Sequence, residues 1–245
     1  MARSYYFLLT SLPGLPELGE PPPMPLREFR ARVLDEPSLA PSVDALLLEH
    51  DLLTRQAALA GEVRLPEGVV LSDGQVAGEE PLPEFLIDPA RPGRRIPSDL
   101  TWEAYFRYLH KMGAGSGSKF LRRWAGFEVG LRNALALARA RTLGLDALEY
   151  LVAPEISDPN AEAITNEAVA AWQQAAEPLA ALRALDQRRR RWIDDNAGYF
   201  TFAADEVLAY AAKLMLVDRW RRIARGPADD AGEAAPSAAK DEHAP

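Results

Sequence analysis

Residues 118–141 carry the pattern that most constrains the fold of this chain. Apolar side chains recur there at alternating steps of three and four residues, which places them on one face of a helix: Phe120, Trp124, Phe127, Leu131, Leu135 and Ala138. Ser118 stands where an N-cap belongs, and Gly144 follows shortly after the end of the pattern. We therefore predict one long helix, against which the other helices of the protein pack.

Polar and charged residues lie beside this apolar stripe and on the apolar faces of two later segments. Leaving one such group buried without a partner costs about 1–3 kcal/mol, so these groups are expected to pair. Asp186 falls on a stripe that includes Leu182 and Ile193, and Lys213 interrupts the apolar run 207–217. In the alternative, the Lys213 side chain reaches water along its own stem. We predict an inner polar cluster made of Glu128, Arg132, Asn133, Asp186, Lys213 and Arg219.

The composition excludes several classes of protein. Hydrophobic residues make up 48% of the 245 residues, which is enough for a substantial core. The net charge of −8 argues against a general nucleic-acid binder, which needs a basic surface. The chain has no cysteine, and no apolar run is long enough to span a bilayer. The N-terminal apolar stretch lacks the features of a secretory signal, so we expect a cytoplasmic protein.

Apolar periodicity predicts an all-α, multi-helix bundle over residues 1–225. Helices are expected at residues 25–34, 42–60, 98–112, 118–141, 146–152, 162–176, 178–196 and 205–225. Residues 5–9 fit a buried strand or an extended plug, and Pro178 either kinks one helix or starts the next. Residues 61–97, where Gly and Pro recur, are expected to be an irregular insertion or a small hairpin. Residues 226–245 are expected to be a disordered acidic tail.

No catalytic, cofactor-binding or metal-binding residues are predicted. The glycines before Lys119 lack the spacing of a phosphate-binding loop, and they most simply form a hinge between two helices. The three histidines, His50, His110 and His243, are scattered and show no zinc-ligand spacing. An enzyme with an unfamiliar site in residues 61–97 stays open as an alternative.

A run of four arginines is the candidate surface for a partner: Arg188, Arg189, Arg190 and Arg191. The functional hypothesis is a docking patch for an acidic partner or for lipid head groups. The alternative is a solvated helix face, because Asp186, Asp194 and Asp195 flank the run and weaken its field.

An acidic residue precedes an arginine by four positions at three places in the chain. The pairs are Asp51 with Arg55, Glu128 with Arg132, and Asp186 with Arg190. The spacing indicates related helical units, but it is also the common spacing of an ion pair within one helix.

Longer motifs add a family resemblance to these observations. They are Tyr5-Tyr6-Phe7-Leu8 with Ser11-Leu12-Pro13, Phe120-Leu121-x2-Trp124-x2-Phe127-Glu128-x2-Leu131-Arg132-Asn133, Asp186 with Trp192 and Asp194, Phe200, Leu208-x-Tyr210-x2-Lys213-Leu214, and Arg219-Trp220. Across most of residues 4–222 the chain resembles a short bacterial branch of the subunit-C-like proteins of V/A-type ATPases, which are relatives of eukaryotic V-ATPase subunit d.

The resemblance implies an all-helical, funnel-like protein built from related helical units. Such a subunit lies between the rotor stalk of the soluble ATPase head and the membrane ring, and it contacts subunits of both. It performs no catalysis, binds no cofactor and couples rotation to ion transport by surface contact. We would then expect the protein at the inner membrane through its complex. A free-standing helical scaffold or adaptor is the main alternative, and co-purification with ATPase subunits would separate the two.

Overall fold

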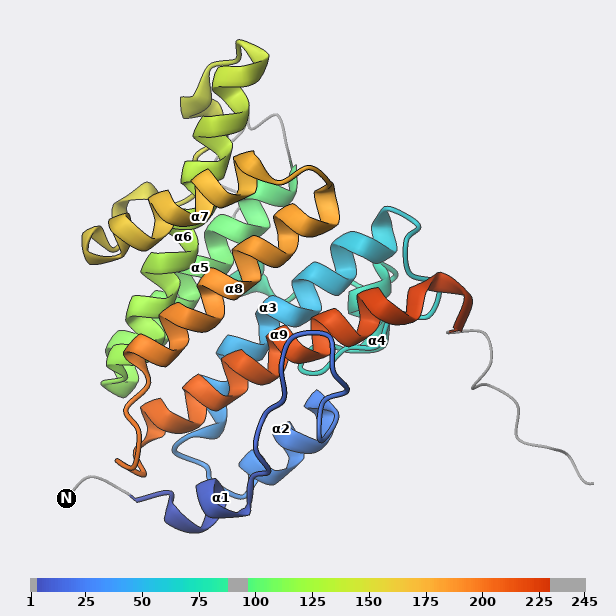
Figure 1. Ribbon diagram of the computed structural model, residues 1–245. Coiled ribbons are helices and arrows are strands. Elements are labelled where there is room, and N and C mark those ends of the chain that lie inside the picture. The colour runs from blue at the N-terminus through green and yellow to red at the C-terminus, as the bar shows by residue number, and fades with distance from the viewer. Residues whose placement is uncertain (1–3, 88–96, 230–245) are drawn as a thin grey trace, which may run out of the picture.

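The computed structural model describes residues 4–87 and 97–229 and forms a bundle of α-helices (Figure 1). The predicted all-α, multi-helix class is confirmed, and no strand occurs within these two ranges. The α-helices are α1 (Tyr6–Ser11), α2 (Leu26–Leu34), α3 (Ala40–Leu59), α4 (Asp73–Ala77), α5 (Pro97–Ser116), α6 (Lys119–Leu143), α7 (Glu162–Gln174), α8 (Pro178–Asn196) and α9 (Ala204–Asp229). Short 3-10 turns lie at Glu84–Leu86, Ala147–Tyr150, Pro154–Ile156 and Pro159–Ala161.

Helix α6 runs from beside the lower end of α8 to the projection at the top of Figure 1, and its ends lie within two residues of the predicted range 118–141. The Ser118 hydroxyl accepts a hydrogen bond from the Leu121 N–H at 3.0 Å, and Gly144 ends the helix in the left-handed conformation with φ +66°. The apolar stripe is buried except for the half-buried Leu135. Helices α5, α7 and α9 all pack on α6.

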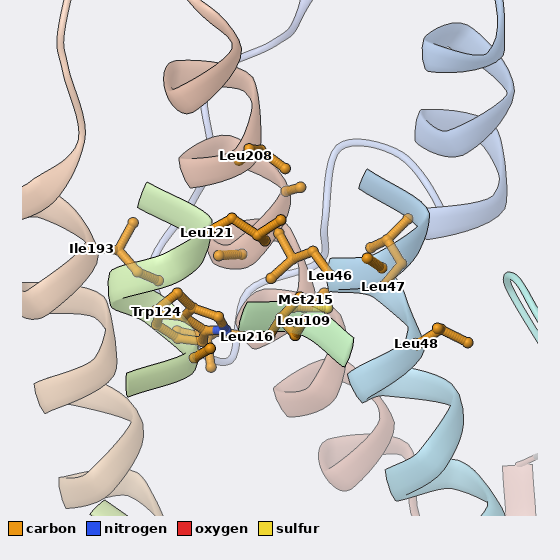
Figure 2. Packing of buried hydrophobic residues seen from close by; sticks show 14 of the residues in the cluster. Leu46, Leu47, Leu48, Leu109, Leu121, Trp124, Ile193, Leu208, Met215 and Leu216 are labelled. Carbon is orange, nitrogen blue, oxygen red and sulfur yellow. The ribbon is translucent and has the colours of Figure 1, made fainter. Parts of the chain in front are cut away.

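The centre of the core lies where α3, α5, α6 and α9 meet. Figure 2 shows Leu46 of α3 facing Leu121 of α6, Leu109 of α5 and Met215 of α9, whereas Leu48 points to the other side of α3. Helix α9 buries nearly every apolar side chain between Val207 and Val217, as the continuous apolar run predicts.

Aromatic rings join α6 to α8. The ring of Trp192 stacks on that of Phe127 with a centroid distance of 4.9 Å, and it also contacts Trp124 at 5.5 Å. Such pairs contribute about 0.5–1.5 kcal/mol each beyond their burial. This contact fixes the face of α8 that points inward, and thereby the direction of the charged residues on that helix.

Helix α5 extends further than predicted. It passes through Gly113 and Gly115 and ends at Ser116, so the predicted break over residues 113–118 is wrong except at Gly117, where φ is +72°. A side chain at Gly113 would place its Cβ 2.6 Å from the backbone nitrogen of Arg122. The glycine therefore allows α5 and α6 to cross closely inside the helix, and it does not mark a hinge.

The structure shows the conformation of three segments whose secondary structure the sequence left open or predicted differently. Residues 5–9 are neither strand nor plug, because they lie at the start of the short helix α1. Pro178 is the first residue of α8, where its missing N–H costs nothing. The helix expected at 146–152 is only a 3-10 turn.

The segment after α3 is irregular, as predicted, and its described part contains no hairpin. It holds α4 and one 3-10 turn, and residues 88–96 lie outside the described part of the chain. The buried carboxylate of Asp51 accepts hydrogen bonds from the N–H groups of Val69, Val70 and Leu71 at 2.8, 2.7 and 2.8 Å. One side chain of α3 therefore holds the insertion against the bundle.

Helix α9 also exceeds its predicted end. It continues to Asp229, so residues 226–229 belong to the helix and not to the expected disordered tail. The rest of that tail, residues 230–245, lies outside the described residues.

Candidate functional site

A buried charge cluster joins α6, α8 and α9. The Arg189 guanidinium donates two hydrogen bonds to Glu128, at 2.7 and 3.0 Å, and one to Asp186 at 2.8 Å. Asp186 also accepts from the Trp220 indole at 2.9 Å and from Arg219 at 3.4 Å. Of the predicted cluster, Glu128, Asp186 and Arg219 thus come together, and Arg189 is the residue that connects them.

Two other predicted members bond elsewhere. Arg132 donates to Asp99 of α5 at 2.9 Å and lies over the Trp102 ring at 5.1 Å. Asn133 donates to the carbonyl of Val152 at 2.9 Å and accepts from its N–H at 2.8 Å. Asn133 therefore fastens the chain that follows α6 back onto the helix, away from the charge cluster.

The assignment of Lys213 to the inner cluster is wrong. Its ammonium pairs with Asp194 and donates to the Tyr199 hydroxyl at 3.0 Å, near the α8–α9 loop. Burial raises the pKa of Asp194, but the hydrogen bonds from Lys213 and Tyr199 outweigh it and leave that pKa below its ordinary value. The prediction failed because a helix face fixes direction only to within a wide angle, and Lys213 lies at the edge of the buried face.

The arginine run does not form one surface patch. Arg189 points inward, with only 13% of its side chain exposed, so its assignment to a docking surface is wrong. Arg190 donates to the Pro16 carbonyl at 2.8 Å and to Glu17 at 3.2 Å. Arg191 reaches Glu167 of α7 at 3.2 Å, and Arg188 lies 3.6 Å from the same carboxylate. The four arginines therefore point in three directions, and each is paired with an acidic side chain of the same chain, Arg188 and Arg191 sharing Glu167.

The three acid–arginine pairs that share a spacing of four residues do not form ion pairs within their helices. Asp51, Glu128 and Asp186 are all buried, yet none of them pairs with the arginine four residues later. Those arginines bond to other groups: the Gln75 carbonyl, Asp99 and Glu17. The three acidic side chains therefore point into the protein, where they accept hydrogen bonds from other groups.

Glu49 belongs to the same region, and the sequence analysis missed it. It lies on α3 and accepts a hydrogen bond from the Trp124 indole at 3.2 Å. Burial and the nearby charge of Glu128 raise the pKa of Glu49 to about 8. The position of Glu49 among the apolar residues of the predicted helix 42–60 could have indicated that its side chain faces the core. Glu49, Glu128, Arg189 and Arg219 line the inner part of a cavity of about 580 Å³.

Exposed apolar side chains gather at both ends of α6. Near its N-terminus an aromatic patch consists of Tyr6, Phe7, Tyr199 and Phe200, with Phe7 86% and Phe200 85% exposed. Past its C-terminus a leucine tip consists of Leu143, Leu145 and Leu148, with Leu143 68% and Leu148 73% exposed. The tip projects from the top of the bundle in Figure 1, whereas α1 and the α8–α9 loop lie at the opposite end.

The loop of the aromatic patch is held in an unusual conformation. Phe200 and Phe202 have φ values of +58° and +52°, a region that bulky side chains seldom adopt. The Glu206 carboxylate accepts hydrogen bonds from the N–H groups of Phe200, Thr201 and Phe202 at 3.1, 3.0 and 2.8 Å. These bonds offset the backbone strain and hold the Phe200 ring out in solvent.

Residues 4–87 and 97–229 contain neither a cluster of metal-ligand side chains nor a helix that could span a bilayer. No cluster of three or more potential ligands could hold a metal ion there. None of the described helices combines the length and the apolar character that crossing a bilayer requires.

These features define an all-helical protein with a buried charge cluster and apolar surfaces near opposite ends of α6. The profile of the family described as "Protein of unknown function (DUF2764)" matches residues 96–228, which is more than half of the chain. The protein belongs to this family. Comparisons with curated proteins and with solved structures gave no match.

Proposed function

We propose that this protein is a non-catalytic coupling subunit of a bacterial V/A-type ATPase, linking the rotor stalk of the soluble head to the membrane ring. The observation that carries the proposal is the pair of exposed apolar surfaces at opposite ends of one stiff helix. Helix α6 has 25 residues, so these surfaces are separated by roughly 37 Å along its axis. A part that passes torque between two partners needs two contact surfaces and a rigid body between them.

The packing of α6 supports rigidity. Its N-terminus is tied to α9, because Asp205 accepts hydrogen bonds from the Ser118 hydroxyl at 2.5 Å and from the Phe120 N–H at 3.2 Å. Its middle is tied to α8 by the Arg189–Glu128 pair and the Trp192 ring. A load applied at either end would therefore be carried by several helices together.

The composition of the two surfaces supports protein partners. Aromatic side chains are enriched among the residues that dominate binding energy, and Phe200 is fixed in an exposed position before any partner arrives. In this proposal the protein is peripheral to the inner membrane and is held there by its complex. Its role depends on shape and contact alone, so no cofactor takes part.

Co-expression with the rotor-stalk and membrane-ring subunits of a V/A-type ATPase from the same genome tests the proposal. We expect the tagged protein to recover both groups of subunits. Phe200→Ala, combined with Phe7→Ala, should remove one group, and Leu143→Ser, combined with Leu148→Ser, should remove the other. Recovery of unrelated proteins without ATPase subunits would favour the scaffold alternative and reject the coupling role.

A further inference from the structure

The cavity beside α6 follows one face of that helix for four turns. Glu128, Arg132, Leu135, Arg139 and Leu143 line it in sequence. Fifteen residues of helix separate its first and last contacts on α6, which corresponds to a length of roughly 22 Å. The cavity volume of about 580 Å³ lies within the range of roughly 300–1,000 Å³ that is usual for small-molecule sites.

The inner end of this cavity contains one carboxyl group, Glu49, that faces Arg189 and Arg219 but, within the described ranges, accepts a hydrogen bond from neither of them. Arg189 is committed to Glu128 and Asp186, and Arg132 is committed to Asp99 and the Trp102 ring. Among the described residues, the only hydrogen-bond donor to the Glu49 carboxyl is the Trp124 indole, at 3.2 Å. A ligand with a positive charge at this position would form an ion pair with the Glu49 carboxylate.

The outer end is open and mostly apolar, although Arg139 also lines it, with its guanidinium over the Trp172 ring at 5.2 Å. Leu135, Leu182 and Leu145 line it together with Leu143, whose large exposed fraction places the mouth at the leucine tip. Hydrocarbon that covers these side chains would remove apolar surface from water on both molecules, at about 0.8 kcal/mol for each methylene group buried.

We propose that this cavity binds a single-chain amphipathic amine, with the ammonium group at Glu49 and the hydrocarbon chain along α6 toward Leu143. The polar end of the ligand meets the Glu49 carboxylate beside Glu128, and its chain follows the apolar positions of successive turns. The mouth of the cavity lies at the leucine tip, but the inference does not depend on the coupling role, because amine binding is measured on the isolated protein without any ATPase subunit.

Proton linkage follows from the surroundings of Glu49. The charged and titratable groups facing it are Tyr105 of α5, Glu128 of α6, Arg189 of α8 and Arg219 of α9. With the pKa of Glu49 near 8, the carboxyl is mostly protonated at pH 6 and must release its proton when an ammonium group binds. Alkylammonium groups keep their proton over this range, as the lysine ammonium does. Affinity for an amine should therefore rise about 50-fold between pH 6 and pH 8.

Isothermal titration calorimetry with butylamine, octylamine and dodecylamine, each below its micelle concentration, tests this site on the full chain. We expect affinity to increase about tenfold for each two methylene groups that the cavity buries, and to increase with pH for every amine. Octanoate and octanol, which have the same chain length and no positive charge, should bind at least tenfold more weakly than octylamine at pH 8.

Two variants separate the head-group contact from the chain contact. Glu49→Gln, a nearly isosteric change, should abolish the pH dependence and weaken octylamine binding about tenfold or more at pH 8. Leu143→Ser, at an exposed position that folding does not require, should weaken dodecylamine binding about threefold to tenfold and leave the pH dependence intact. Equal amine affinity in the wild type and in Glu49→Gln, absence of binding, or a preference for octanoate would overturn the proposal.

Discussion

Arg189 of α8 donates two parallel hydrogen bonds, of 2.7 and 3.0 Å, to the carboxylate of Glu128 of α6, and both side chains are almost entirely buried. Its third bond, to Asp186 at 2.8 Å, extends the contact toward Trp220 of α9. One guanidinium thus balances two buried carboxylates that come from neighbouring helices. Planar geometry of this kind is specific to arginine, since lysine presents a point charge.

Arg189→Met should destabilise the protein severely. The change leaves Glu128 and Asp186 without their main cationic partner in the interior, and breaking a buried pair in this way costs about 3–5 kcal/mol. Urea unfolding followed by circular dichroism measures the loss. Arg188→Met is the matched control one residue earlier, because Arg188 is partly exposed and lies 3.6 Å from Glu167, and it should change stability by less than about 1 kcal/mol. Similar stability for both variants would show that the cluster contributes no more than a surface pair.

Because Arg189 is buried, the four arginines of residues 188–191 should not all be mutated together. Reversing all four charges would unfold the protein through Arg189 and reveal nothing about docking. Reversal at Arg188 and Arg191, by substitution with glutamate, keeps the core intact and tests only the surface contribution. If the proposed docking role is correct, assembly should weaken while the unfolding midpoint stays within a few degrees of the wild type.

Glu49 should make stability depend on pH. Its pKa is about 8 in the folded protein against an ordinary value of 4.5, so the folded state holds a proton that the unfolded chain has lost. Stability contributed by that proton falls as pH rises from about 5 to 8. Glu49→Gln should remove this decline and be more stable than the wild type at pH 8, by about 3–4 kcal/mol, with little difference at pH 5. Unfolding curves at both pH values measure the effect, and a constant difference between the two proteins would contradict it.

Glu206 should control the aromatic loop and leave the bundle unaffected. Glu206→Ala removes the acceptor of three backbone N–H groups, so the loop loses about 1–2 kcal/mol of local stability and Phe200 is no longer held in place. Limited chymotrypsin digestion after Tyr199 or Phe200 should become faster than in the wild type. Glu62→Ala, at an exposed site after α3, is the control and should digest as the wild type does. Unchanged digestion of the Glu206 variant would mean that other contacts fix the loop.

Asp51 should hold the irregular insertion in place. Asp51→Asn replaces an acceptor of three backbone N–H groups by an amide that has one oxygen, at a cost of about 2–3 kcal/mol. Hydrogen exchange at Val69, Val70 and Leu71 should accelerate more than exchange in the core of α6. Asp35→Asn, at an exposed helix end, is the control and should leave all of these rates unchanged. Uniform acceleration across the protein would indicate global destabilisation instead.

The sequence predicted the helices well because most of them have one continuous apolar face. The ends of α6 were predictable from Ser118 and Gly144, whose capping roles depend on local chemistry. The end of α5 was not predictable in this way. The role of Gly113 depends on how closely another helix crosses it, and no local pattern encodes that approach.

The sequence predicted that a buried charge cluster exists, but it identified only some of the residues that form the cluster. Asp186 lies on an apolar stripe and Glu128 lies beside one, so both were expected to be near the core and to need partners. Their main partner, Arg189, was hidden in a run of four arginines, where one position faces inward and the others do not. Glu49 and Lys213 illustrate the same difficulty, because a shift of one helical position decides whether a charge meets the core or the solvent.

The central claim, that this protein joins two partners through opposite ends, is tested most directly by purifying a tagged protein together with the rotor-stalk and membrane-ring subunits of the V/A-type ATPase from its own genome. Mass spectrometry of the captured complex should detect both groups of subunits with the wild type. The aromatic-patch variants and the leucine-tip variants should each lose a different group. Capture of neither group, or loss of both groups with either pair of substitutions, would contradict the two-ended account.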